Sequence, residues 1–378
     1  MPGSVARVRC DVAVVGGGPA GAVAAYILAG AGARVALIVR DQPKSALGIG
    51  ETVPAQTRAL LQRLGLDFLS PDVHLPSAGT MARWGSDALH YREAILSPYG
   101  SGWHLDRRLF EKQLVAAAVR SGAWLIDDCS AIETRRAAAG WEFGIAYSGR
   151  RICIGSSYLV DCTGRTARLA LAAGARRKIH DKLIAIWCVA EQARSRDDLD
   201  QRIYLESAPD GWLYSAKIPR QRRVIVYFTD GDLCRIALMR TRANFEAYVA
   251  GSFHLQEAAD GFEYSIVAGP YCVNAASARL LQAYGEGWIA AGDAAQSFDP
   301  LSSQGIMSAI IGGHNAAAAL IAAHSSDHSA LETYQAELDG QYGAYLTERP
   351  GHYRAEQRWN GRPFWQRRQG PHIARFKL

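Results

Sequence analysis

The sequence predicts an α/β fold in which strand–turn–helix units at both ends of the chain are interrupted by an antiparallel sheet and followed by a helical tail. Near the N-terminus, a glycine-rich turn separates an apolar run from a helix of small residues. Three short strands with turn residues between them fill the middle, at 202–206, 212–218 and 223–229. A further strand–turn–helix unit occupies 288–319. One discontinuous α/β domain with an inserted sheet accounts for this order.

Composition is that of an ordinary globular protein, with 49% hydrophobic and 21% charged residues in 378. The length suggests two or three folding units. No apolar run reaches the roughly 20 residues of a membrane span, and "MPGSVARVRCDVAVVGGG" lacks the pattern of a signal peptide. The seven cysteines are scattered without a CxxC pair. We therefore expect thiols in a reducing compartment, neither a metal site nor a disulfide framework, and a cytoplasmic location.

The net charge of +6 comes mostly from arginine. Arginine suits bidentate contacts with phosphate and carboxylate groups. The chain has no block of like charges and no nucleic-acid reader motif, so we expect no nucleic-acid partner. An acidic protein partner or an anionic cofactor remains open.

The N-terminal unit has the spacing of a dinucleotide-binding turn. The run at 12–15 reads as a buried strand, 20–29 as a helix of small residues, and 34–39 as a second strand. Between them lie three glycines in GxGxxG spacing, Gly16, Gly18 and Gly21. The first permits a tight turn, the second lets a pyrophosphate approach the backbone, and the third lets helix and strand pack closely. The helix start then offers free amides to the phosphates.

The end of the second strand departs from the usual pattern. An acidic residue normally stands there to hold the adenosine ribose. Here the place falls on Val39, followed by Arg40 and Asp41. Either Asp41 reaches the ribose, or Arg40 contacts the adenosine moiety.

Four later segments exceed what a simple NAD domain needs. "GIGETVP" (48–54) precedes an amphipathic helix, and Asp106 and Arg107 begin another. "YLVDCTGRTARLALAAG" (158–174) and "WIAAGDAAQSFDPLSSQGI" (288–306) each read as strand, polar turn and helix.

In this order the segments resemble the FAD-dependent monooxygenases with the para-hydroxybenzoate hydroxylase fold, and within them the tryptophan-halogenase-like branch. "GIGETVP" is similar to the glycine–Glu–Pro turn of that branch, and "FDPLSSQGI" to its Pro–Leu–Ser loop. Flavoproteins of tryptophylquinone cofactor biogenesis, which oxidise a tryptophan in another polypeptide, are closer still. They are expected to carry "GDAA…FDPLSSQGI" and a tail like "RWNGRPFWQRR". The resemblance implies a Rossmann-like FAD-binding domain.

The resemblance also implies roles for single residues. Asp293 would accept hydrogen bonds from the flavin ribityl hydroxyls, and Pro300 would line the flavin face. Amides at the start of the last helix would stabilise negative charge on the reduced ring. The implied FAD contacts are Gly16, Gly18, Ala20, Gly21, Arg40, Glu51, Thr52, Arg107, Asp293, Pro300, Gln304, Gly305 and Ile306.

For three sites the role implied by the resemblance has a structural alternative. Ser302 and Ser303 are either helix N-caps or functional contacts. Arg107 is either a cofactor contact or a surface arginine. Asp161 and Gly164 match the second dinucleotide fingerprint of the family, or only shape the turn beneath the cofactor.

The inserted sheet is the expected substrate domain, with a fourth strand in "LIAIWCVAEQA" (183–193). Its candidate wall residues are Trp187, Trp212, Tyr214 and Tyr227, whose alternative is ordinary sheet packing. We expect the FAD domain at 1–75, 100–180 and 271–330, the substrate domain at 76–99 and 181–270, and a C-terminal helix and tail at 331–378.

Halogenases of this branch share a relay lysine after the GxGE turn and a Trp-x-Trp-x-Ile-Pro segment. Here no lysine lies between Lys44 and Lys112, and the segment reads "WLYSAKIP". The resemblance therefore implies hydroxylation of an electron-rich ring through a flavin 4a-hydroperoxide, with O₂ as co-substrate and NAD(P)H or a partner reductase as electron donor. A halogenase of a small aromatic, a geranylgeranyl-reductase-like oxidoreductase and a non-catalytic FAD-binding chaperone are the alternatives.

Candidate catalytic residues are Glu51 and Ser303, with His74, His90 and His104 as further titratable groups. The arginines and aromatics of 352–376 are of the types enriched at protein interfaces. Their alternative is a tail that packs back on the FAD domain. We expect a tryptophan within a polypeptide to be held in an open, positively lined cleft.

Overall fold

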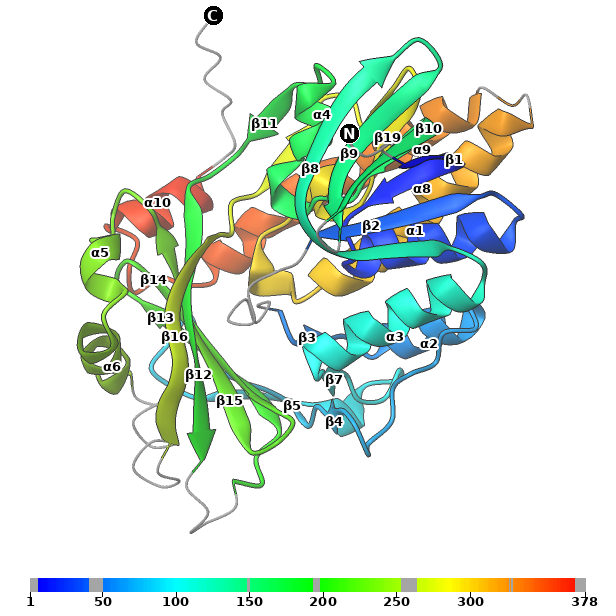
Figure 1. The fold of residues 1–378 in the computed structure, drawn as a ribbon. Helices are drawn as coiled ribbons and strands as arrows, with labels where there is room; N and C mark the ends of the chain where they lie inside the picture. The colour runs from blue at the N-terminus through cyan, green and yellow to red at the C-terminus, as the bar shows by residue number, and fades with distance from the viewer. Residues whose placement is uncertain are drawn as a thin grey trace, which may run out of the picture.

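The computed structural model describes residues 6–40, 50–147, 150–192, 198–252, 264–325, 327 and 329–370. Within them, helices cover a mostly parallel sheet, and a second, antiparallel sheet stands beside this layer (Figure 1). The predicted α/β class with an inserted antiparallel sheet is confirmed.

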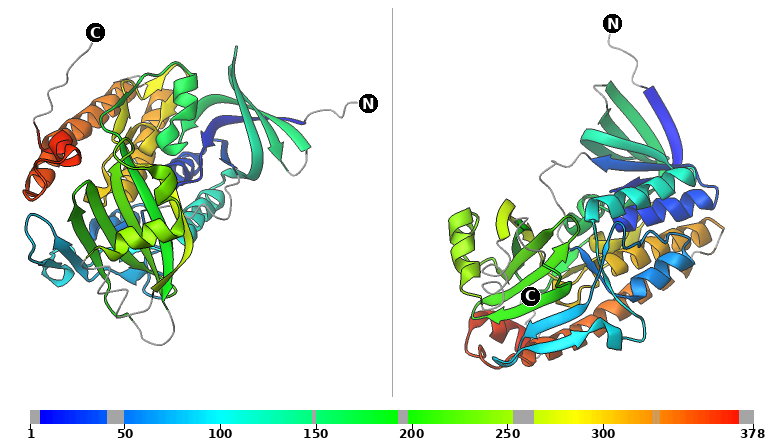
Figure 2. Two further views of the ribbon diagram at one scale, coloured as in Figure 1. Left: turned by 90° about the vertical axis from the view of Figure 1, so that its left-hand side faces the viewer. Right: turned by 90° about the horizontal axis from the view of Figure 1, so that it is seen from below.

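The first sheet has seven strands and carries the glycine turn at the end of its central strand. Its members are β1 (Ala6–Val15), β2 (Val35–Arg40), β8 (Trp124–Ala137), β9 (Gly140–Tyr147), β10 (Arg150–Asp161), β18 (Tyr284–Gly285) and β19 (Trp288–Ala290). β1 pairs in parallel with both β2 and β10, and β10 pairs in parallel with β19. The antiparallel hairpin of β8 and β9, which the sequence reading missed, extends from the body of the molecule (Figure 2).

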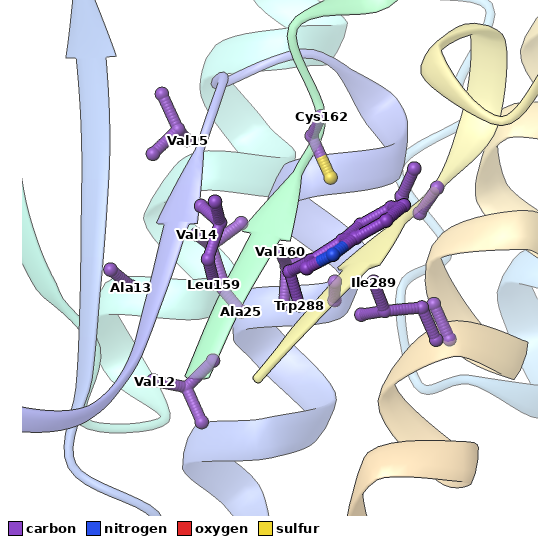
Figure 3. Close-up of a cluster of buried hydrophobic side chains, with 14 of the residues drawn as sticks. Val12, Ala13, Val14, Val15, Ala25, Leu159, Val160, Cys162, Trp288 and Ile289 are labelled. Carbon is purple, nitrogen blue, oxygen red and sulfur yellow. The ribbon is translucent and has the colours of Figure 1, made fainter. Parts of the chain in front are cut away.

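The core of this domain lies between the parallel strands and helices of small residues. Val14, Leu159 and Ile289, from three neighbouring strands, are fully buried and point into one cluster (Figure 3). Helix α1 (Pro19–Gly30) packs closely on α8 (Gly305–His324): a Cβ added at Gly313 would lie 2.2 Å from the Ala20 carbonyl oxygen. Helix α8 is the one described helix long and apolar enough to cross a membrane, and here it belongs to this core.

Two further helices cover α1 on its other side. They are α2 (Gln56–Arg63) and α3 (Arg107–Arg120), with Leu61, Phe110 and Leu114 in a shared buried cluster. Asp106 caps α3 by accepting a hydrogen bond from the Leu109 amide at 3.1 Å, as the predicted helix start requires.

The second sheet has seven strands in the order β16 (Tyr264–Asn274), β12 (Leu183–Gln192), β15 (Arg222–Asp230), β14 (Gly211–Ile218), β13 (Arg202–Ala208), β5 (Gly79–Arg83) and β6 (His90–Glu93). The four predicted strands correspond to β12, β13, β14 and β15. One face contacts α6 (Arg242–Ala250), which lies near α5 (Ile236–Met239) on the outside of the molecule (Figure 1). The opposite face turns toward the first domain.

Short elements join the two large sheets. One small sheet comprises β3 (Thr52–Val53), β7 (Trp103–His104) and β4 (Leu75–Pro76), and the other β11 (Arg177–Ile179), β17 (Ala278–Leu280) and β20 (Gln296–Ser297). The remaining short helices are η1 (Ala94–Leu96), η2 (Gly164–Thr166), α4 (Arg168–Ala172), η3 (Gly292–Ala294) and η4 (Pro300–Ser302).

The C-terminal tail comprises α9 (Ser329–Arg354) and α10 (Pro363–Gln369). Helix α9 packs on the first domain, where Tyr334 and Leu338 join its core, and α10 packs on the second sheet. Phe364 and Trp365 are fully buried in one cluster with Trp212, and Arg368 forms a buried ion pair with Asp230. The inserted sheet thus buries Phe364, Trp365 and Arg368, for which both expectations are wrong. Tyr353 instead bonds Asp299 of the FAD domain, in keeping with a tail that packs back on it. For the exposed Arg354 and Arg367, contact with a partner stays a prediction.

Candidate functional site

A pocket of about 1370 Å³ runs from the glycine turn after β1 to the inner face of the second sheet. Its nucleotide end is lined by the turn at 16–18, by α3 and by the end of β2. Its sheet end is lined by side chains of β12, β14 and β15: Ala185, Trp212, Tyr214, Val226 and Phe228. The segments at 162–166, 291–293 and 298–306 lie between these ends, so the motifs singled out in the sequence converge on one cavity.

The three motif glycines occupy places that fit the roles expected of them. Gly16 has φ +119°, and a Cβ there would lie 2.1 Å from the Cys162 carbonyl oxygen. A Cβ at Gly21 would lie 1.9 Å from the Gly16 oxygen. Gly18 lines the pocket, and a Cβ there would meet no protein atom within 4 Å. Helix α1 begins at Gly18 without a side-chain cap, so its first amides are open to a pyrophosphate.

Basic side chains surround this end of the pocket. Arg40, at the end of β2, lines it, whereas its alternative Asp41 lies outside the described residues. The exposed basic residues in the lining are Arg40, Arg108, Lys112, Arg120 and Arg168. Their charge suits an anionic cofactor. The open, positively lined cleft expected around a polypeptide stays a prediction.

Asp293 and Pro300 lie between the two ends. Asp293 is about one-third exposed, lines the pocket and forms an ion pair with Arg165 at 3.3 Å. The Asp299 carboxylate holds the following loop by accepting hydrogen bonds from the Leu301 amide at 3.1 Å and from Tyr353 at 2.8 Å. The tail thus fixes the loop that carries Pro300, a link that sequence motifs did not reveal.

The start of α8 shows that Ser302 and Ser303 do not cap this helix. Its N-cap position is Gln304, and no side chain caps it, so the cap role considered for Ser302 and Ser303 is wrong. Ser303 adopts φ +52° and lines the pocket with Gly305 and Ile306. Gln304 is exposed and does not line the pocket, so its contact with the flavin stays a prediction.

Glu51 lies behind the pocket wall rather than in it. It is 4% exposed, and its neighbours Gly50 and Thr52 supply the lining. Burial raises the pKa of Glu51 to about 7, although nearby backbone amides and Arg107 oppose the rise. Its Oε2 has no hydrogen-bond partner among the described residues. A carboxyl group with such a pKa can release and take up a proton near neutrality.

Arg107 is tied into the wall rather than lying free on the surface. Its side chain is 19% exposed, lines the pocket, bonds Glu111 through Nε at 2.6 Å and donates from Nη1 to the Gly50 carbonyl oxygen at 2.7 Å. The surface alternative for Arg107 is wrong.

A chain of hydrogen bonds leads from the sheet wall into the protein, and the sequence reading missed it. The Tyr214 hydroxyl lies 2.7 Å from Thr52 Oγ1, which lies 2.9 Å from His104 Nδ1. His104 Nε2 lies 2.8 Å from the Gln201 carbonyl oxygen. Thr52 and His104 pair across β3 and β7, and no sequence motif around either residue predicts this pairing.

Two of the four predicted wall residues line the pocket. Trp212 and Tyr214 do so, and Phe228, which we did not predict, stacks on Trp212 with ring centroids 4.0 Å apart. The assignment is wrong for Trp187, which packs on Tyr271 outside the lining. It is also wrong for Tyr227, which occupies the opposite face of the sheet against α6.

Other candidates have structural roles. Buried His74 accepts a hydrogen bond from the Asp106 amide at 3.0 Å, and exposed His90 bonds Ser86; neither lines the pocket. The buried Asp161 carboxylate accepts from the Leu169 amide at 2.9 Å and the Ala170 amide at 2.7 Å, so it shapes the turn. Gly164, at φ +67°, lines the pocket beside it.

Comparison with known proteins supports a FAD-binding role for this pocket. Residues 9–341 match the FAD binding domain family, and the chain belongs to that family. LodB of Marinomonas mediterranea, assigned as a FAD-dependent oxidoreductase, is 29% identical over 95% of this chain and 96% of its own. A digeranylgeranylglycerophospholipid reductase of Methanoculleus marisnigri is 27% identical over 86% of this chain and 81% of its own.

Solved structures show the same fold. The myxobacterial chondrochloren halogenase CndH superimposes with a TM-score of 0.84 at 20% identity, covering 97% of this chain and 87% of its own. The peptidyl tryptophan dihydroxylase QhpG superimposes with a TM-score of 0.75 at 21% identity, covering 96% of this chain and 79% of its own. The chain thus belongs to the FAD binding domain family and shares its fold with a halogenase and a peptidyl tryptophan dihydroxylase.

Proposed function

We propose that this member of the FAD binding domain family is a FAD-dependent monooxygenase that hydroxylates an electron-rich aromatic ring, and that the ring is a tryptophan side chain in a partner polypeptide. The continuous pocket carries the proposal. Its nucleotide end has the glycine turn and basic side chains that FAD requires, and its sheet end has aromatic walls.

The residues fit FAD along the whole path. Gly18 leaves room for a pyrophosphate, Asp293 offers a carboxylate to ribityl hydroxyls, and Gly305 and Ile306 present amides at the start of α8. Bound there, reduced FAD would supply activated oxygen from O₂, after accepting two electrons from NAD(P)H or a partner reductase. One oxygen atom enters the ring, and the other leaves as water.

The chain itself orients the ring and excludes water. Trp212 and Phe228 form a stacked pair on the sheet wall, against which a flat ring can pack. Their apolar surface, with Ala185 and Val226, favours an aromatic guest and sheds water from the reacting atoms. Glu51 is the proposed base: its pKa of about 7 lets it take up a proton near neutrality, and because it lies behind the wall, the proton that the ring loses would reach it indirectly rather than by contact with the ring. Ser303, in the lining, is a second candidate for a contact with the reacting groups.

Hydroxylation accounts for the residues better than two of the alternatives, a halogenase and an isoprenoid reductase. No lysine occurs from residue 45 to residue 111, where halogenases of this branch have their relay lysine. A long isoprenoid chain would need an extended apolar channel, whereas this sheet wall carries the aromatic rings of Trp212, Tyr214 and Phe228. QhpG, a peptidyl tryptophan dihydroxylase, provides a precedent for a polypeptide substrate on this fold.

Product masses test the proposal. The FAD-loaded protein is reduced and mixed with O₂ and chloride, with tryptophan-containing peptides, free tryptophan or a small phenol as substrate. We expect one or two oxygen atoms to be added to peptide-bound tryptophan. A gain of chlorine would favour a halogenase, and a gain of hydrogen in an isoprenoid lipid would favour a reductase. Rapid turnover of free tryptophan or the phenol would overturn the polypeptide substrate and leave a general monooxygenase.

A further inference from the structure

We propose that Tyr214 is a fixed hydrogen-bond acceptor for the ring N–H of the substrate, and that Thr52 and His104 set its direction. This inference deepens the proposed function, on which it rests, by naming the group that the pocket recognises. It follows from the chain of hydrogen bonds behind the sheet wall.

The chain can be oriented from its inner end. The Gln201 carbonyl oxygen can only accept, so His104 Nε2, 2.8 Å away, must carry a proton and donate it. His104 is fully buried, and burial together with the positive charge of Arg223 lowers its pKa to about 4. Its imidazole is therefore neutral near pH 7, with Nδ1 as an acceptor.

The donor and acceptor of each remaining hydrogen bond, from His104 out to Tyr214, follow from this assignment. Because Nδ1 accepts, the Thr52 hydroxyl donates its proton across the 2.9 Å bond to His104. Thr52 has a single hydroxyl proton, so across the 2.7 Å bond to Tyr214 it can only accept. The proton of the Tyr214 hydroxyl consequently points toward Thr52 Oγ1 at the edge of the pocket, and not toward a ring on the sheet wall.

What Tyr214 offers to the pocket is a lone pair. Its neighbours on the sheet wall, Ala185, Val226 and Phe228, have no polar side-chain atoms, and the Trp212 Nε1 atom is buried. Among these five wall residues, the Tyr214 oxygen is thus the polar group available to a ring. A fixed acceptor favours a ring with an N–H donor, as in indole, over an isosteric ring without one, because the unmatched oxygen would be left unpaired.

The test compares two isosteric probes, 3-methylindole and 3-methylbenzothiophene, which differ in the ring N–H. Binding of each to the FAD-loaded protein is measured from changes in the flavin absorbance spectrum. A neutral hydrogen bond predicts that the wild-type protein binds 3-methylindole about three- to tenfold more tightly. Tyr214→Phe should abolish this preference. Tyr227→Phe is the matched control, because it makes the same change on the opposite face of the sheet and should keep the preference.

Thr52→Val tests the orientation separately. It retains Tyr214 but removes the acceptor of its proton, so the hydroxyl becomes free to turn its proton toward the ring, and the preference should shrink. An unchanged preference in this variant would overturn the assignment of direction to Thr52 and His104.

Several results would overturn the proposal that Tyr214 accepts a hydrogen bond from the ring N–H. No wild-type preference, no binding of either probe, or a preference that survives in Tyr214→Phe would overturn the proposal. So would a Tyr214→Phe variant that keeps the preference and changes only the reduction potential of the flavin, since the acceptor would then serve a flavin N–H. A wild-type protein that prefers 3-methylindole and yet adds no oxygen to any tryptophan would overturn the hydroxylation and leave the recognition standing.

Discussion

Replacing Gly18 by alanine should separate cofactor binding from folding. The backbone there has φ −72° and ψ −179°, an extended conformation that any residue adopts, and the added methyl group meets no protein atom within 4 Å. We therefore expect the apoprotein to change in stability by less than about 1 kcal/mol. The methyl group would instead occupy the space through which the pyrophosphate reaches the α1 amides.

The loss of FAD affinity can be estimated from those amides. A hydrogen bond to a charged group contributes roughly 1.5–3 kcal/mol, so losing one should weaken FAD binding by about 10- to 150-fold. Fluorescence titration of the apoprotein with FAD measures this loss, and thermal unfolding of the apoprotein measures stability. Gly16→Ala is the contrasting variant, because its φ of +119° and a Cβ only 2.1 Å from the Cys162 carbonyl oxygen should cost roughly 2 kcal/mol or more of folding stability. Unchanged FAD affinity in Gly18→Ala would refute the assigned path of the cofactor.

Three further predictions concern single side chains. The protein should purify yellow with one non-covalent FAD, and Asp293→Ala should lower FAD affinity about tenfold or more; full occupancy of that variant would contradict the role of Asp293. Arg368→Met should cost roughly 1.5–3 kcal/mol in urea unfolding, because it removes the buried partner of Asp230 and leaves this carboxylate only its pair with the partly exposed Arg367, whereas Arg362→Met, at a half-exposed pair, should cost under about 1 kcal/mol. Because burial raises the pKa of Glu51 from 4.5 to about 7, its neutral form favours the native state, and this contribution is lost as pH rises through that window. The wild-type apoprotein should thus lose roughly 2–3 kcal/mol more than Glu51→Gln between about pH 5 and pH 8; parallel unfolding curves would show that Glu51 ionises freely.

The elements that local patterns specify could be predicted from the sequence. The turn at Gly16 and Gly18, the capped start of α3 at Asp106 and the four strands of the inserted sheet depend on steric demands and alternation between neighbouring residues. Their energetic causes lie within a few residues, so a sequence displays them directly.

What could not be predicted depends on partners far apart in the chain. The prediction placed Tyr227 on the wrong face of the sheet. Both faces of β15 are apolar, so the alternation of polar and apolar residues along the strand does not show which face lines the pocket. The packing of Phe364 and Trp365 was not predicted, because large aromatic residues are expected equally at an interface with a partner and on the chain's own sheet. The bond between Thr52 and Tyr214 joins residues 162 positions apart, and no local signal reveals it.

The most direct test of the shared pocket is an experimental structure of the FAD-loaded protein with 3-methylindole bound. We predict that FAD extends from Gly18 past Asp293 to Pro300, and that the indole ring lies on the Trp212 side with its N–H about 3 Å from the Tyr214 oxygen. A flavin outside this cavity, or an indole bound away from the wall formed by Trp212 and Tyr214, would contradict the account.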